Sequence, residues 1–333
     1  MTLLDRLDSW ARYELAPWQA SGIGHNAIRS TVRDMAEAAG PIYGFDIDRG
    51  NVAIVEGRCP THPSAIAVFG QRAELYRRHL EQSVRLHCPD LSTSIAISLQ
   101  DRDFERRDVP LFVFQKQRGS AQVLLPDVDL LGADFFEAPQ YADLVAFEDK
   151  RAEAVFVGVT TGGPVTTAAI ADGTHPRIRA AMAFREKPGV TFELPVLADN
   201  ELPQAEEAFR ALRLGNRRWD WAEQYGYRYL ISMDGNGATC SRVALALMSN
   251  GVLLKYNSPF LLHYFRGLEP WHHYIPAIRD ADVVAVVESA ERSAQRDAAI
   301  AARSRQFAHD YLSREASLFY TGQLLRRYVE AIA

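Results

Sequence analysis

The stretch "YLISMDGNGATCSRVALALMSNGVLLK", residues 229–255, passes from an apolar run to a loop of small residues and back to an apolar run. Its first part, Tyr229–Met233, predicts a buried strand, and the apolar spacing over 240–249 predicts a helix. The turn 234–237 joins them, with Thr239 or Ser241 expected near the helix N-cap. A strand, a glycine-rich turn, a helix and a second strand form the repeating unit of a parallel α/β sheet.

The same alternation extends over the C-terminal half of the chain. We expect strands at 154–158, 190–194, 227–233 and 251–256, and helices at 164–172, 176–185, 203–213 and 240–249. The N-terminal half reads as a mixed α/β unit, with helices at 3–18, 27–39 and 63–87, a strand pair around 49–51, and strands at 94–99, 111–114 and 121–125. The polar stretch 147–153 is the best candidate for a domain boundary.

Composition narrows the class of protein. The chain has 333 residues, of which 47% are hydrophobic and 24% charged, so it can bury a large core, and its length favours two domains. A net charge of −5 gives no global reason to bind nucleic acid. The N-terminus lacks the apolar core of a signal peptide, and no stretch approaches the roughly 18 apolar residues of a membrane span. Three cysteines without CxxC spacing fit reduced thiols. We therefore expect a cytosolic protein.

The Gly-Asn-Gly turn has the features of a phosphate cradle. Small residues let a ligand approach backbone N–H groups, and a helix N-terminus favours an anion. Arg242 adds a bidentate phosphate donor, and Lys255 adds a second cation at the end of the next strand. The alternative is a tight βα turn followed by a solvated arginine, and these residues alone leave both interpretations open.

The type of phosphate compound can be narrowed. A dinucleotide fingerprint requires a third glycine where this chain has Cys240, and an acid roughly 20 residues on, where it has Lys255. A Walker A loop also fails, because no Gly-Lys-Ser/Thr follows the turn. A nucleotide sugar is excluded by neither missing motif, so it remains a candidate ligand.

Residues 227–282 resemble the core of glycosyltransferase family 90, which includes protein O-glucosyltransferases, fungal capsule xylosyltransferases and bacterial lipopolysaccharide-modifying enzymes. The resemblance is carried by "RYLISMDGNGATCSR" (228–242), "LLK" (253–255) and "PWHHYIP" (270–276). "VFVGVTTGG" (155–163), "HPRIRAAMAF" (175–184) and the tail 304–332 are similar to further family segments, so the resemblance covers roughly 150–333.

The resemblance implies a GT-B-like α/β fold, in which two Rossmann-like domains face each other across a cleft. Residues 1–148 would form the acceptor-side domain and 149–305 the nucleotide-sugar domain, with closing helices at 306–333 that return to the first domain. In "AISLQDRDFERRDVPLFVF" (96–114), Asp101 matches the general base of the family's glucosyltransferases, and Asp103 is the near alternative. Alternatively, the charged residues that follow the strand form a solvated loop without a catalytic role.

Donor-site residues also carry over from the resemblance. The expected donor-binding set is Gly158, Thr160, Thr161, Gly162, Arg177, Asp234, Gly235, Gly237, Ala238, Thr239, Ser241, Arg242, Lys255 and His273. The chain departs from the family at Val157, where relatives commonly have arginine. Either Arg177 or Arg179 supplies what that arginine does, or the donor differs.

The implied reaction is an inverting, metal-independent transfer of glucose, galactose or xylose from a UDP-sugar to a hydroxyl of a surface glycan such as lipopolysaccharide core or capsule. Asp-x-Asp occurs at Asp46, Asp101 and Asp127, but so short a pattern arises often by chance, and we expect neither metal nor cofactor. The expected partners are the UDP-sugar and a glycan or lipid-linked glycan acceptor, with peripheral contact at the inner face of the cytoplasmic membrane and no nucleic acid.

Two other classes of function stay open. An NADP-dependent oxidoreductase would use the same turn with Lys255 near the 2′-phosphate, although the missing third glycine and "PWHHYIP" argue against it. A nucleotide-sugar-binding protein without catalysis is the other, and Val157 is the residue that keeps it open.

Overall fold

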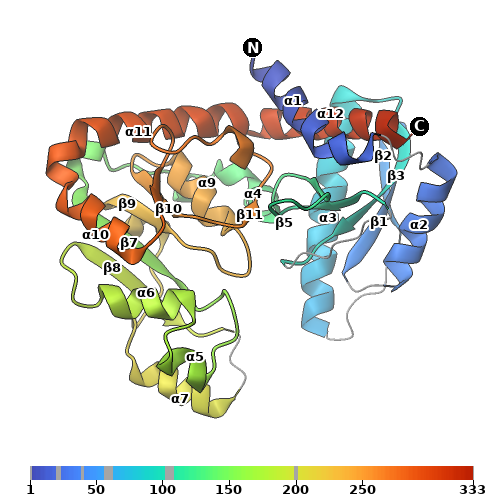
Figure 1. Ribbon diagram of the computed structural model, residues 1–333. Helices are drawn as coiled ribbons and strands as arrows, with labels where there is room; N and C mark the ends of the chain where they lie inside the picture. Colours follow the sequence, from blue (N-terminus) through green and yellow to red (C-terminus); the bar gives the residue numbers. More distant parts are fainter. Residues whose placement is uncertain are drawn as a thin grey trace. The chain divides into compact units, whose positions relative to one another are not determined.

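The computed structural model describes residues 2–19, 24–38, 41–55, 63–101, 109–198 and 202–332. It divides into two compact units (Figure 1). Unit 1 consists of 1–135, 259–266 and 310–333, and unit 2 of 136–258 and 267–309. Neither unit is therefore continuous in sequence.

Unit 1 is built on a mixed five-stranded sheet with the order β2-β1-β3-β4-β6. The strands are β1 (Ile42–Asp48), β2 (Asn51–Val55), β3 (Ser92–Ser98), β4 (Leu111–Val113) and β6 (Val123–Leu124). β1 is antiparallel to β2 and β3, whereas β3, β4 and β6 are parallel. A separate two-stranded sheet joins β5 (Lys116–Gln117) to β11 (Phe260–Leu261). The helices are α1 (Leu3–Leu15), α2 (His25–Ala38), α3 (Pro63–His87), α4 (Val128–Gly132) and α12 (Arg314–Ile332).

Helix α12 ties unit 1 together. It packs against α1 and α3 (Figure 1). The Tyr328 ring meets Phe112 edge to face at 5.2 Å, and its hydroxyl donates to the carbonyl of Ser94 in β3. The buried ion pair between Lys116 Nζ and Glu14 Oε2, 2.6 Å long, fixes α1 to the strands.

Unit 2 contains a parallel five-stranded sheet with the order β12-β10-β9-β7-β8. The strands are β7 (Arg151–Val159), β8 (Val190–Val196), β9 (Tyr227–Ser232), β10 (Val252–Tyr256) and β12 (Ile275–Ala277). The helices are α5 (Thr167–Ala171), α6 (Pro176–Phe184), α7 (Pro203–Ala211), α8 (Trp221–Gln224), α9 (Cys240–Met248), α10 (Asp280–Glu288) and α11 (Ala290–Tyr311). Short 3₁₀ helices lie at Ala16–Trp18, Asp134–Phe136, Pro139–Tyr141, Phe147–Asp149 and Phe265–Gly267.

A large apolar cluster of unit 2 lies on one face of this sheet. The rings of Phe156 and Phe192 on neighbouring strands stack at 4.3 Å, and α6 and α10 contribute to the same apolar cluster. On that face Tyr229 also donates from its hydroxyl to the buried carboxylate of Asp297 in α11, at 2.7 Å. Helix α9 packs against β9 and β10.

The sheet of unit 2 has a topological switch point. From β7 the chain goes first to β8 on one side and then to β9, β10 and β12 on the other, so the strand order reverses between β7 and β9. In open parallel sheets, ligands bind outside the carboxyl ends of the strands at such a point. The loops after β7 and β9 are therefore the first place to look for a site.

The predicted α/β class and the parallel sheet in the C-terminal half are confirmed. The two-residue strands β5 and β11 are not among the elements predicted from sequence, because a strand so short has no alternation to detect. Among the helices of the described ranges, none is both long and apolar enough to cross a membrane.

Candidate functional site

Two loops meet at the switch point of unit 2. One follows β7 and contains Thr160, Thr161 and Gly162, and the other follows β9 and contains residues 234–239. Gly162 donates from its backbone N–H to the Asn236 side chain at 3.4 Å. A Cβ on Gly235 would lie 2.4 Å from the Thr161 hydroxyl oxygen, so only glycine allows the two loops to approach this closely.

Arg177, near the start of α6, holds both loops. Its guanidinium donates to the carbonyl of Val159 at 2.7 Å and to the Thr161 hydroxyl at 2.8 Å on the β7 side. On the β9 side it donates to the carbonyls of Met233 at 2.8 Å and Asp234 at 3.1 Å. These bonds use four of the five N–H donors of an arginine. The structure thus gives Arg177 a bracing role between the loops.

Thr160 anchors the first loop from the other side. It is fully buried, and its hydroxyl both donates to the carbonyl of Ala198 at 3.1 Å and accepts from the Ala198 N–H at 2.8 Å. The ring of His175, which caps α6, lies 3.1 Å from the Thr160 carbonyl. The Thr160 hydroxyl is therefore committed to the protein, although sequence analysis expects it at the donor.

Arg242 enters the site from the first turn of α9. Its guanidinium donates to the carbonyl of Val157 at 2.7 Å and to Gln224 Oε1 at 3.0 Å. It lies over Phe156 at 4.3 Å and over Trp221 at 5.1 Å. Protein groups of the described chain take two of its five donors, so the guanidinium is oriented and still has donors to offer.

The site is a concentration of buried positive charge. Burial lowers the pKa of Arg177 to about 10, and burial together with the charge of Arg177 lowers the pKa of Arg242 to about 9. Lys255 is buried at the end of β10. Asp234 is the acid beside them. Burial raises its pKa, while a Ser258 hydrogen bond and the charges of Lys255 and Arg177 oppose that rise. Such a site favours a bound anion.

Helix α9 begins at this loop. Its N-cap, Thr239, has a left-handed backbone (φ 50°, ψ 56°) and makes no side-chain cap to the helix. The Thr239 hydroxyl lies 2.9 Å from that of Ser232 instead. Gly237 and Ala238 precede the cap, and Ser241 lies in the first turn beside Arg242. The positive end of the helix dipole therefore faces the same loop.

Most of the predicted donor set is thus brought together, including Gly158 near the carboxyl end of β7. His273 is not: it precedes β12, whose Ile275 pairs with Leu254 in mid-β10, so it lies toward the amino ends of the strands. There its Nδ1 accepts from Glu269 N–H, and its carbonyl accepts from Ser304 of α11. Arg179 points elsewhere as well, to an ion pair with Asp280.

The proposed base Asp101 lies in unit 1, beyond the carboxyl end of β3. Arg72 Nη1 donates to its Oδ1 at 3.0 Å and to the Leu99 carbonyl at 2.6 Å. Gln115 donates to the Asp101 backbone carbonyl at 2.6 Å. The carboxylate remains 44% exposed, so it is both oriented and accessible. The alternative base Asp103 lies outside the described residues.

Sequence analysis missed the residues that support the site. His175 before Pro176 could have been found, because it stands at the N-cap position of the predicted helix. Gln224 and Trp221, which hold Arg242, come from a four-residue helix that gives no periodic signal.

A family comparison bears directly on this site. The model of glycosyl transferase family 90 matches residues 83–333, which is most of the chain and includes both loops and Asp101. The chain belongs to glycosyl transferase family 90.

Individual relatives match a shorter segment. The human Protein O-glucosyltransferase 3 is 30% identical over 107 residues, and the zebrafish (Danio rerio) Protein O-glucosyltransferase 2 is also 30% identical over 107 residues. The mouse Protein O-glucosyltransferase 3 is 28% identical over the same length. Each match covers 32% of this chain and 21% of the relative, so the matched segment spans about a fifth of those proteins.

Proposed function

We propose that this family 90 protein is a glycosyltransferase that moves glucose, galactose or xylose from a UDP-sugar to a hydroxyl group. The observation that carries the donor assignment is the positive charge at the switch point, where Arg177 and Lys255 act on Asp234 and Arg242 is close enough to Arg177 to be influenced by its charge. A diphosphate would neutralise this excess of cations. The name of the human relative, an O-glucosyltransferase, supports glucose as the first sugar to test.

The reaction follows from these charges. The Asp101 carboxylate takes the proton of an acceptor hydroxyl as its oxygen attacks the anomeric carbon. The bond from that carbon to the phosphate oxygen breaks, and the electron pair leaves with the UDP. Attack opposite the leaving group inverts the anomeric configuration. Arg242 and the amides at the start of α9 stabilise the charge that develops on the diphosphate.

We infer that the reaction needs no metal ion. A divalent cation on a diphosphate neutralises charge and orients the leaving group. Here the guanidinium groups of Arg177 and Arg242 and the ammonium group of Lys255 already supply positive charge beside the loops. Added chelator should therefore leave donor binding unchanged.

For the acceptor we propose a hydroxyl of a surface glycan, free or linked to lipid, used in the cytoplasm or at the inner face of the membrane. The relatives' names point to protein acceptors for those proteins. A protein acceptor is therefore the competing outcome of an acceptor screen.

Donor binding can be tested by thermal shift with UDP, UDP-glucose, UDP-galactose, UDP-xylose, GDP-mannose and NADP⁺, each with and without EDTA. We expect stabilisation by the UDP compounds that survives EDTA. Stabilisation by NADP⁺ alone would favour the oxidoreductase. If no UDP compound raises the melting temperature, the donor assignment is refuted.

Catalysis is tested separately by slow hydrolysis of the UDP-sugar. Asp101→Asn should lose hydrolysis and keep UDP binding, whereas Asp90→Asn, at an exposed acid before β3, should keep both. Equal hydrolysis by Asp101→Asn and wild type would remove Asp101 from the mechanism. Donor binding without hydrolysis in wild type, with every acceptor tested also inert, would favour a binding protein.

A further inference from the structure

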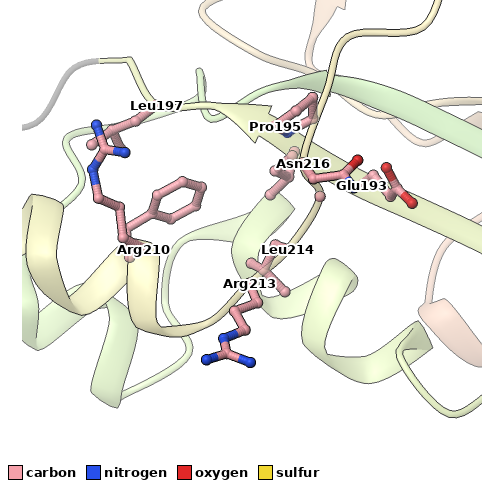
Figure 2. A pocket seen from close by; sticks show the side chains of 10 residues that line it. Glu193, Pro195, Leu197, Arg210, Arg213, Leu214 and Asn216 are labelled. Carbon is pink, nitrogen blue, oxygen red and sulfur yellow. The ribbon is translucent and has the colours of Figure 1, made fainter.

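Unit 2 has an open pocket of about 690 Å³ beside its edge strand β8, with Glu193 and Arg210 on its lining (Figure 2). The pocket adjoins the loop after β7, because Thr160 donates from its backbone N–H to the carbonyl of Val196 on the same strand at 3.1 Å. It therefore belongs to the donor side of the site described above. The groups that prepare the acceptor hydroxyl are to be sought in unit 1, around Asp101.

In unit 1, one arginine of α3 holds the candidate base. Arg72 Nη1 donates to Asp101 Oδ1 at 3.0 Å and to the carbonyl of Leu99, directly after β3, at 2.6 Å. A single nitrogen thus binds both the carboxylate and the backbone two residues before it. The bond to the carboxylate ends on Oδ1, so the arginine fixes one oxygen of the base and leaves Oδ2 open to a proton donor.

The arginine is itself held in place. Its guanidinium carbon lies 5.9 Å from the ring centroid of Phe69 and 5.5 Å from that of Phe114, within the range of cation–π contacts. Gln115, next to Phe114, donates to the backbone carbonyl of Asp101 at 2.6 Å. The Arg72 side chain is 22% exposed and the Asp101 side chain 44%. The carboxylate is therefore the more open partner, supported from behind by a mostly covered guanidinium.

Such support matters for a general base. A base must bring its oxygen within about 2.6–3.2 Å of the hydroxyl from which it takes the proton. A free aspartate side chain rotates about two bonds, and an ion pair to Oδ1 removes this freedom before the acceptor arrives. The family model begins its match at residue 83, so Arg72 lies in the part of the chain that this match does not cover.

We infer that Arg72 is a positioning residue for the base, which holds Asp101 Oδ1 so that Oδ2 meets the acceptor hydroxyl. The inference rests on the proposed function, in which the Asp101 carboxylate takes the acceptor proton. Arg72 acts on the proton transfer only through Asp101. Its loss should therefore lower turnover without changing donor affinity, and only while the carboxylate is present.

The test is a double-mutant cycle on slow hydrolysis of the UDP-sugar, with wild type, Arg72→Gln, Asp101→Asn and the double variant. We expect Arg72→Gln to lower kcat roughly 10- to 100-fold, because a misplacement of about 1 Å at a catalytic group costs on that order. Its affinity for UDP, measured by calorimetry, should equal that of wild type. In the Asp101→Asn background, Arg72→Gln should change kcat by at most about twofold, because no base is left to position.

Two further variants separate positioning from a general effect on α3. Arg78→Gln is the matched control, since Arg78 lies on the same helix with a 66% exposed side chain in a surface pair with Glu74. It should match wild type in kcat and in UDP affinity. Arg72→Lys keeps the charge and loses the planar fork, so its kcat should fall between those of wild type and Arg72→Gln. Urea unfolding checks that each variant is folded.

The outcomes distinguish this inference from the proposed function. If Asp101→Asn loses turnover and Arg72→Gln keeps it, the base stands and Arg72 does not position it. If Arg72→Gln lowers kcat by the same factor in both backgrounds, or lowers UDP affinity as much as kcat, Arg72 does not act through Asp101 and the inference is overturned. If Asp101→Asn turns over as wild type does, or wild type hydrolyses no UDP-sugar, the proposed mechanism falls and the inference falls with it.

Discussion

Arg177 is expected to be a major contributor to the stability of unit 2. Arg177 is 4% exposed, and its guanidinium makes four hydrogen bonds, three to backbone carbonyls and one to a hydroxyl, across two loops. At about 1 kcal/mol net for each bond, Arg177→Leu should lower the free energy of unfolding by about 4 kcal/mol. Relief of the repulsion with Arg242 reduces this loss somewhat. Arg177→Lys keeps the charge but reaches fewer acceptors, so about 2 kcal/mol is expected.

The assay is urea unfolding followed by far-ultraviolet circular dichroism, on wild type and on both variants. The matched controls are Arg179→Leu and Arg179→Lys, because Arg179 lies two residues further along α6 with a 45% exposed side chain in a surface ion pair. Such pairs contribute about 0–1 kcal/mol, so the controls should stay close to wild type. If Arg177→Leu lies within 1 kcal/mol of the Arg179 variants, the bracing role assigned to Arg177 is wrong.

Three further predictions concern unit 1. Asp101→Asn should reduce turnover of a UDP-sugar by at least about 100-fold with unchanged donor affinity, and a loss confined to affinity would contradict its role as base. Burial and the neighbouring Asp129 raise the pKa of Asp127 from 3.8 to about 7, so the folded state binds this proton more tightly than the unfolded state. The contribution of this proton to stability is therefore full below pH 3.8 and is lost as the pH rises through 7. Between pH 5 and 8, the urea midpoint should fall more in wild type than in Asp127→Asn. An equal fall of the midpoint in both proteins would refute this prediction. Glu14→Ala should cost about 3–5 kcal/mol because it leaves Lys116 buried without its partner, and Glu14→Leu with Lys116→Met should recover most of that loss; a single variant as stable as wild type would contradict the buried pair.

The fold class could be predicted because long periodic segments carry most of it. Helix α3 begins and ends at the predicted residues 63 and 87, and β9, the turn at 234–237 and α9 follow each other as the sequence around Asp234 indicates. These segments have either an amphipathic period or a glycine-rich turn between apolar runs. The division of the chain into units was harder to read, since 259–266 belongs to unit 1 although it follows β10 of unit 2.

The candidate site was only partly predictable. The glycines and Arg242 stand next to each other in sequence, so a local pattern identifies them. The role of Arg177 depends on carbonyl groups more than 50 residues away, just after β9, and no local pattern reports such contacts.

The most direct test of the central claim is calorimetric titration of UDP, in the presence of EDTA, into wild type, Arg242→Ala and the control Arg179→Ala. If the diphosphate binds at the switch point between β7 and β9, wild type and Arg179→Ala bind UDP equally, and Arg242→Ala binds it at least about tenfold more weakly. If wild type fails to bind UDP without metal, or if folded Arg242→Ala binds it as wild type does, the diphosphate does not lie where the structure places this buried charge.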